Sequence, residues 1–159
     1  MFAEPQQEHR WLDKLVGEWT SEFECRMGPD EPTMKSQGVE VVRSLGGLWI
    51  VGEGEGEAPD GNTSKTVMSL GYDPRIKRYV GTFIASMMTH LWVYNGSLDA
   101  AGKVLTLDTE GPDFSGQKLA KYKDIIEFVD DDHRTLTSRI LGDDGTWSQL
   151  MTAHYHRKK

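Results

Sequence analysis

The sequence predicts an all-β fold, namely a closed, antiparallel up-and-down β-barrel of about ten strands with a short N-terminal helix. After Gly17, apolar and polar residues alternate in short segments, and turn-forming residues such as Asp73-Pro74 separate these segments. The spacing between segments leaves no room for crossover helices, which argues against a parallel sheet. A long meander has two exposed edges unless it closes on itself, so a barrel is favoured over a β-sandwich, which would leave no cavity.

One segment has a helical pattern, over residues 8–16. Its apolar residues form a single stripe that must pack against the rest of the protein: Trp11, Leu12, Leu15 and Val16. We therefore expect one domain, 1–159, with the helix at 8–16 and the barrel over 17–157. The strands are expected at 18–27, 35–45, 48–57, 65–72, 77–85, 88–98, 103–111, 119–129, 134–141 and 147–157.

Composition and charge exclude several classes of protein. The 159 residues carry a formal net charge of -7, which argues against nucleic acid or an anionic membrane as the main partner. Cys25 is the only cysteine, so an intrachain disulfide is excluded. The sequence has no apolar signal core and no apolar run long enough for a membrane span, so we expect a cytoplasmic protein.

Alternation along the strands predicts which side chains face the interior. In 88–98, large amphipathic residues share one face, and in 119–129 the lysines occupy the face opposite Tyr122 and Asp124. Such residues are typical of a ligand-binding wall, although they also fit a filled core in which His90 bonds to a carbonyl group. The residues predicted to bind a ligand are Trp19, Phe83, Met88, His90, Trp92, Tyr94, Tyr122 and Asp124.

An inward-facing Asp124 requires a hydrogen-bonding partner, and His90, Tyr122 and Arg139 are all candidates. If His90 is that partner, it would serve as a general acid or base in an enzyme, oriented by Asp124 or Tyr122. The sequence contains no Gly-x-Ser-x-Gly elbow or other nucleophile motif, so we predict no catalytic residues and favour a protein without catalytic activity.

Two further motifs have simpler interpretations. The run Gly52-Glu-Gly-Glu-Gly-Glu57 is not followed by a helix, so it does not predict a phosphate-binding loop. As a strand it places the glycines on the inner face and the glutamates in solvent. His154 and His156 share one strand face, but the sequence shows no third ligand, so neither a metal site nor a cofactor is predicted.

The sequence also resembles a known family. Gly17-Glu-Trp19, which follows the helix, resembles the Gly-x-Trp signature of the calycin (lipocalin-like) superfamily. Longer segments are similar to the bacterial domain of unknown function 1579 family: Leu15-Val-Gly-Glu-Trp19, Gly71-Tyr-Asp-Pro74, Tyr79-Val-Gly-Thr-Phe83 and Ser86-Met-Met-Thr-His-Leu-Trp92. The resemblance implies a barrel but brings no established activity. Haem-binding calycins use a C-terminal histidine, which implies His154 or His156 as a haem ligand in an alternative interpretation.

The function expected from these observations is the binding of a small, hydrophobic or amphipathic molecule in the barrel interior, without catalysis or cofactor. An enzyme that uses His90, and haem or metal binding through His154 or His156, are the alternatives. A homodimer formed through an exposed barrel face is compatible with each of them.

Overall fold

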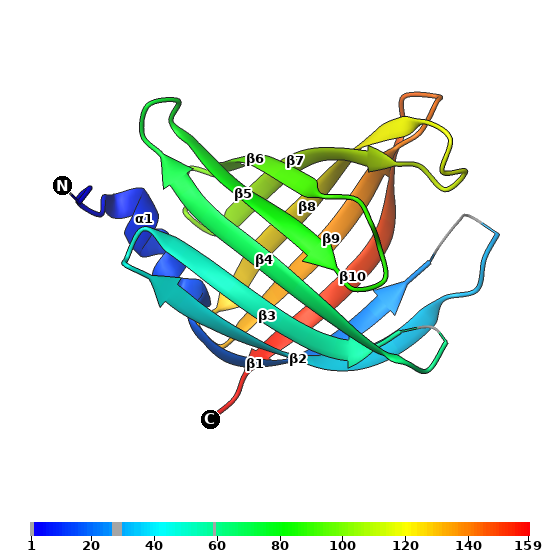
Figure 1. Ribbon diagram of the computed structural model, residues 1–159, viewed down its shortest axis with the longest axis horizontal. Helices are drawn as coiled ribbons and strands as arrows, with labels where there is room; N and C mark the ends of the chain where they lie inside the picture. Colours follow the sequence, from blue (N-terminus) through cyan, green and yellow to red (C-terminus); the bar gives the residue numbers. More distant parts are fainter. Residues whose placement is uncertain (1, 27–29, 59) are drawn as a thin grey trace.

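The structure is a computed structural model that describes residues 2–26, 30–58 and 60–159. One short helix, α1 (Gln7–Leu12), precedes ten strands (Figure 1). The strands are β1 (Gly17–Cys25), β2 (Met34–Leu45), β3 (Trp49–Glu57), β4 (Thr63–Asp73), β5 (Arg78–Ala85), β6 (Trp92–Leu98), β7 (Val104–Pro112), β8 (Leu119–Asp130), β9 (His133–Leu141) and β10 (Trp147–Arg157). Residue 27, the expected end of the first strand, lies outside the described residues.

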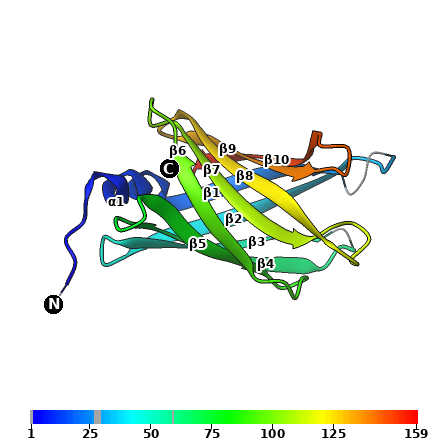
Figure 2. The ribbon, with the colours of Figure 1, turned by 90° about the horizontal axis from the view of Figure 1, so that it is seen from above.

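The predicted closed barrel is confirmed. Each strand pairs antiparallel with its neighbours in sequence, and β1 closes the barrel by pairing with β10, from Trp19 opposite Arg157 to Cys25 opposite Met151. Figure 2 shows the strands wrapping around one interior, with α1 at one end. Closure gives every strand two hydrogen-bonded neighbours, so no sheet edge is left open. No helix in the described parts of the chain is long and apolar enough to span a membrane.

The N-terminal helix is shorter than expected. The α-helix ends at Leu12, and residues Asp13–Leu15 continue as a 3-10 turn that leads into β1. The turn tightens the chain so that Leu15 and the following strand both face the interior. The buried side chains of the helix and turn pack in the core. Trp11 Nε1 donates a hydrogen bond of 2.7 Å to the Gly102 carbonyl oxygen. These contacts fix the helix across the barrel end. We call this the closed end.

Trp19 belongs to this closed end. Its side chain is fully buried, and its Nε1 donates a hydrogen bond of 2.9 Å to the carbonyl oxygen of Leu15. Arg157, next to Trp19 in the β1–β10 register, places its guanidinium over the indole and donates to the Val16 carbonyl oxygen. These contacts join the first and last strands to the segment that closes the barrel.

The sixth strand begins at Trp92, four residues later than the expected start at 88. The backbone N–H of Met88 donates to the Ala85 carbonyl oxygen, which folds the segment after β5 into a turn. Alternation alone does not reveal this turn, because Met88 and His90 continue the same pattern outside the sheet. Met88 and His90 therefore lie on the β5–β6 connection at the open end of the barrel.

The glycine–glutamate run forms β3 as expected. Glu53, Glu55 and Glu57 are exposed, while the register of Gly54 opposite Glu40 places the glycines on the inner face. A Cβ atom added at Gly52 would lie 2.9 Å from a carboxylate oxygen of Glu40. The glycine therefore leaves the space that this buried glutamate occupies.

Candidate functional site

The two halves of the barrel interior differ in packing. Near α1 the inward side chains are fully buried in a solid core that includes Leu70, Leu105, Leu107 and Ile126. In the open half, apolar side chains on inward-facing register positions keep part of their surface accessible: Phe23, Met68, Phe83, Leu136 and Met151. They point into the barrel and pack against the core, but they are only partly buried. The open half of the interior is therefore the candidate site.

Asp124 lies where the packed core meets this half, and it is held by two hydroxyl groups. In the register it stands between Leu107 of β7 and Ser138 of β9. The Ser138 hydroxyl donates to Oδ1 over 2.6 Å, and the buried Tyr94 hydroxyl donates to Oδ2. The prediction that Asp124 faces inward and is hydrogen-bonded is thus confirmed, but its partners are Tyr94 and Ser138 rather than His90, Tyr122 or Arg139.

The surroundings of Asp124 favour its neutral form. Burial raises the pKa of the carboxyl group above its ordinary value, and the hydrogen bonds from Ser138 and Tyr94 offset part of this effect. Burial, together with the charge of Asp124, also raises the pKa of the Tyr94 hydroxyl well above its ordinary value. Tyr94 is therefore a hydrogen-bond donor, not an anion, at neutral pH.

Asp124→Asn tests this pKa shift. A carboxyl group whose folded-state pKa is raised contributes stability that is present at low pH and is lost as pH rises through the folded pKa. The free energy of unfolding of the variant should therefore increase relative to the natural protein as pH rises above about 4. Urea unfolding at several pH values measures this difference. Asp108→Asn, at an exposed position, is the control; a difference for Asp124→Asn that shrinks as pH rises would contradict the shift.

Three aromatic rings form the rim of the open half. The Trp92 indole lies between His90 and Tyr122, with ring centroids 4.7 and 5.0 Å away and edge-to-face geometry. His90 Nε2 is 2.8 Å from the carbonyl oxygen of Glu110, and the Tyr122 hydroxyl donates to the Pro112 carbonyl oxygen over 2.5 Å. The rim is thus fixed to the β7 backbone on both sides of the indole.

A buried ion pair separates the open half from the packed core. Arg134 Nη2 lies 2.6 Å from Glu40 Oε1, and the two side chains are only 4% and 14% exposed. The guanidinium carbon is 4.6 Å from the ring centroid of Trp19 and 4.0 Å from that of Tyr155. The pair is therefore neutral as a unit and lies against aromatic rings, while Arg134 Nε is buried without a hydrogen-bond partner.

The structure brings together most of the predicted ligand-binding residues, but not all of them. Tyr94, Tyr122 and Asp124 face the interior, as do Phe83 and Trp92. Of the remaining three, Trp19 lies in the closed-end core and Met88 on the β5–β6 connection, while His90, on the same connection, reaches the rim through its contact with Trp92.

These positions bear on the catalytic alternative. His90 bonds to a backbone carbonyl group, and Asp124 bonds to two hydroxyl groups. The Tyr122 hydroxyl donates to the Pro112 carbonyl oxygen, so the hydrogen bonds described for His90 include neither of the two groups predicted to orient it.

The haem alternative can be examined in the same way. His154 and His156 are exposed, on the outward-facing positions of β10, and alternate with inward-facing Ala153 and Tyr155. A group bound inside the barrel therefore lies beyond the reach of both histidines.

Comparison with known proteins now places the chain. The family described as "Protein of unknown function (DUF1579)" matches residues 4–157. The chain belongs to this family. Among curated proteins, none matches it.

Solved structures of similar architecture support the fold of this family member. An S-type phycobiliprotein lyase, CPES from Guillardia theta, has a TM-score of 0.65 at 15% identity and covers 98% of this chain and 99% of its own. Rv2717c from M. tuberculosis has a TM-score of 0.64 at 13% identity, covering 98% and 100%. The barrel EF1p2_mFAP2b bound to DFHBI has a TM-score of 0.50 at 16% identity, covering 96% and 100%. At these identities the likeness concerns the fold alone.

Several residues of the site were missed in the sequence analysis of this DUF1579 member. Met68, Leu136, Ser138 and Met151 all border the open half. Alternation in the segments 65–72 and 134–141 contains the signal for the first three. For Met151 the signal is disturbed, because the β9–β10 register shifts between Gln149 and Met151. A bulge reverses the inward and outward positions that simple alternation predicts.

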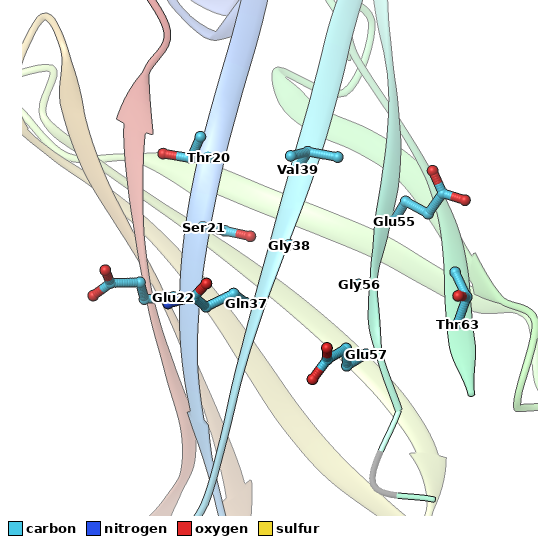
Figure 3. A pocket seen from close by; sticks show the side chains of 10 residues that line it. All are labelled: Thr20, Ser21, Glu22, Gln37, Gly38, Val39, Glu55, Gly56, Glu57 and Thr63. Atoms are coloured by element: carbon cyan, nitrogen blue, oxygen red, sulfur yellow. The ribbon is translucent and has the colours of Figure 1, made fainter. Parts of the chain in front are cut away.

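A hollow of about 610 Å³ lies at the wall formed by β1, β2 and β3 (Figure 3). Its centre is the glycine pair Gly38 and Gly56, where the wall carries no side chains. Exposed outward-facing residues surround this centre, among them Glu22, Glu55 and Glu57. The hollow is acidic and open, unlike the largely apolar interior.

Proposed function

We propose that this protein binds one small, uncharged, largely apolar molecule in the open half of its barrel, without catalysing a reaction on it. The observation that carries the proposal is the accessible apolar surface on the inner wall at Phe23, Met68, Phe83, Leu136 and Met151. Large apolar side chains that face the interior of a soluble protein are usually fully buried, and apolar concave surfaces are the usual form of small-molecule sites.

The charges of the interior support an uncharged ligand. Glu40 and Arg134 neutralise each other, and both oxygens of the buried Asp124 carboxyl group already accept hydrogen bonds from the protein. A ligand carboxylate would meet a guanidinium whose charge Glu40 already neutralises, so its desolvation would be only partly compensated. A molecule with a carbonyl or hydroxyl group on an apolar body meets these conditions better.

Polar atoms at the site support a ligand with a hydrogen-bonding group. In the described part of the chain, Arg134 Nε of the ion pair is buried without a hydrogen-bond partner, and so are Trp92 Nε1 and Thr109 Oγ1. The last two atoms bear on the open half. Both come from inward-facing positions of neighbouring strands, β6 and β7. Buried polar atoms are normally paired, so a small shift of either side chain toward a bound molecule would gain a hydrogen bond.

Ligand use by other barrels is consistent with the proposal. One barrel of similar architecture, EF1p2_mFAP2b, is bound to DFHBI, and CPES acts as a phycobiliprotein lyase. The cytoplasmic location and the homodimer remain predictions from the sequence.

A neutral, environment-sensitive naphthalene dye, prodan, tests the proposal. We expect its emission to shift to the blue and its intensity to saturate on titration with the protein, because the dye enters an apolar space. Met68→Trp, which places an indole in that space, should weaken binding by about tenfold or more. The neighbouring Val67 is an exposed apolar residue, so Val67→Trp is the matched control.

Two results would contradict the proposal. One is the absence of saturable dye binding by the natural protein, together with no co-purifying small molecule in native mass spectrometry. The other is equal binding by Met68→Trp and Val67→Trp proteins that both fold, since the dye would then occupy the outer surface.

A further inference from the structure

Three histidines meet on the outer face of the barrel, away from the interior site. His133 on β9 is the register partner of His156 on β10, and His154 lies two residues before His156 on the same face. The sequence shows His154 and His156 as a pair without a third ligand. The strand register supplies His133, twenty or so residues earlier in the chain, as the missing neighbour.

The nitrogen atoms of this cluster have a separation suited to a metal ion. His133 Nε2 and His154 Nδ1 are 3.0 Å apart and share a hydrogen bond. Two imidazole nitrogens bound to one ion at about 2.0–2.1 Å lie roughly 2.9 Å apart at a right angle and about 3.4 Å apart in a tetrahedron. The His156 ring stacks on His133 with centroids 4.4 Å apart, so it lies next to the same position.

We propose that His133 and His154 bind a divalent transition-metal ion that prefers imidazole ligands, such as Cu²⁺ or Ni²⁺, and that His156 completes the site by rotating its side chain. As they stand, no three described His, Cys, Asp or Glu side chains surround a common metal position. His154 and His156 are exposed and His133 is half-buried, so the rotation disturbs no core packing.

Binding of the ion by His133 and His154 requires only a change of tautomer in one of the two rings. The proton shared between the two rings is displaced by the ion, and the ring that carried it holds its proton on the other nitrogen instead. His133 then carries its proton on Nδ1 and His154 on Nε2, so two neutral imidazoles bind the ion without net proton release. The metal–nitrogen bonds replace one nitrogen–nitrogen hydrogen bond.

Neighbouring carboxylates favour a cation at this position. Glu22 of β1 is the register partner of His154, and Asp130 is the register partner of His133. Both are exposed, and they add negative charge to a chain whose formal net charge is already -7. The acidic surroundings raise the local concentration of divalent ions.

Isothermal titration of the tag-free, full-length protein with Cu²⁺ and with Ni²⁺ tests the site. We expect one saturable ion per chain. Loss of a residue that only hydrogen-bonds to a metal ligand weakens metal affinity ten- to a hundredfold. His133→Ala and His154→Ala each remove a ligand itself, so each should weaken the affinity by at least about tenfold. His90→Ala, which removes a histidine at the open end, should leave the affinity unchanged.

Electron paramagnetic resonance of the Cu²⁺-loaded protein gives an independent measure. We expect nitrogen splitting from two or more imidazoles, with one fewer coordinated imidazole in His133→Ala. The proposal is overturned if the natural protein shows no saturable binding. It is equally overturned if His90→Ala weakens binding as much as His133→Ala does, or if only His156→Ala weakens it.

Discussion

Arg134→Met should destabilise the protein by about 3–5 kcal/mol, because it leaves the Glu40 carboxylate buried without its partner. The substitution also removes the guanidinium that lies between the rings of Trp19 and Tyr155. The free energy of unfolding from urea or guanidinium titration measures the loss. The dependence of this energy on denaturant concentration should stay unchanged if the folded barrel keeps its structure.

Two variants separate the buried charge from simpler explanations. Arg43→Met breaks the exposed ion pair with Glu53, in which the charged atoms lie 2.9 Å apart, and should cost less than about 1 kcal/mol. The double variant Glu40→Leu/Arg134→Met removes both charges and should recover much of the stability that Arg134→Met loses. Equal costs for Arg134→Met and Arg43→Met, or no recovery in the double variant, would show that the interior solvates Glu40 by itself.

Local chemistry was enough to predict the fold from the sequence. Turn residues divide the chain into strands, and the alternation within each strand assigns the two faces of the wall. The predicted strand boundaries are wrong where a segment outside the sheet still alternates apolar and polar residues, as residues 88–91 do. The helix is shorter than its apolar stripe because residues Asp13–Leu15 tighten into a 3-10 turn that leads into β1.

The candidate site was predicted less completely, because its contacts depend on strand register. Alternation correctly turns Asp124 inward, but pairing with Tyr94 and Ser138 requires the offsets between β6, β7, β8 and β9. Alternation also cannot distinguish the closed end from the open end. Trp19 and Phe83 both face inward, yet one lies in a solid core and the other borders accessible space.

The ion pair between Glu40 and Arg134 cannot be predicted from the sequence, because ninety-four residues separate the two residues. Each looks like an ordinary charged strand residue. Their burial follows from closure of the barrel, which brings β2 and β9 to opposite sides of β1 and β10. The glycines of β3 make this arrangement possible, because a side chain at Gly52 would meet the Glu40 carboxylate.

Gly81→Ala should destabilise the protein by about 3 kcal/mol, more than most single-methyl additions. Gly81 faces inward on β5, between Leu70 of β4 and Tyr94 of β6. A Cβ atom here would overlap the Ser69 carbonyl oxygen far inside van der Waals contact and would lie 2.9 Å from a methyl carbon of Leu70. The obstacle is backbone, so no side-chain rotation relieves it.

The close approach at Gly81 has a local cause. The Ser69 hydroxyl bonds to the Thr82 hydroxyl over 2.8 Å and accepts a hydrogen bond from the Thr82 backbone N–H over 3.2 Å. These bonds draw β4 and β5 together where the barrel wall bends, and a strand glycine commonly marks such a bend. An added methyl group must therefore push the two strands apart.

Gly142→Ala is the matched control, because the nearest atom to its added Cβ is a carboxylate oxygen of the flexible Asp144 side chain at 3.1 Å. It should change the free energy of unfolding by less than about 1 kcal/mol. Thermal or urea unfolding of both variants measures the contrast. Because Gly81 pairs with Tyr94, spreading β4 and β5 should also disturb the hydrogen bond to Asp124 and the walls around it. Equal stability of the two variants would mean that the β4–β5 wall yields more easily than its backbone contacts imply.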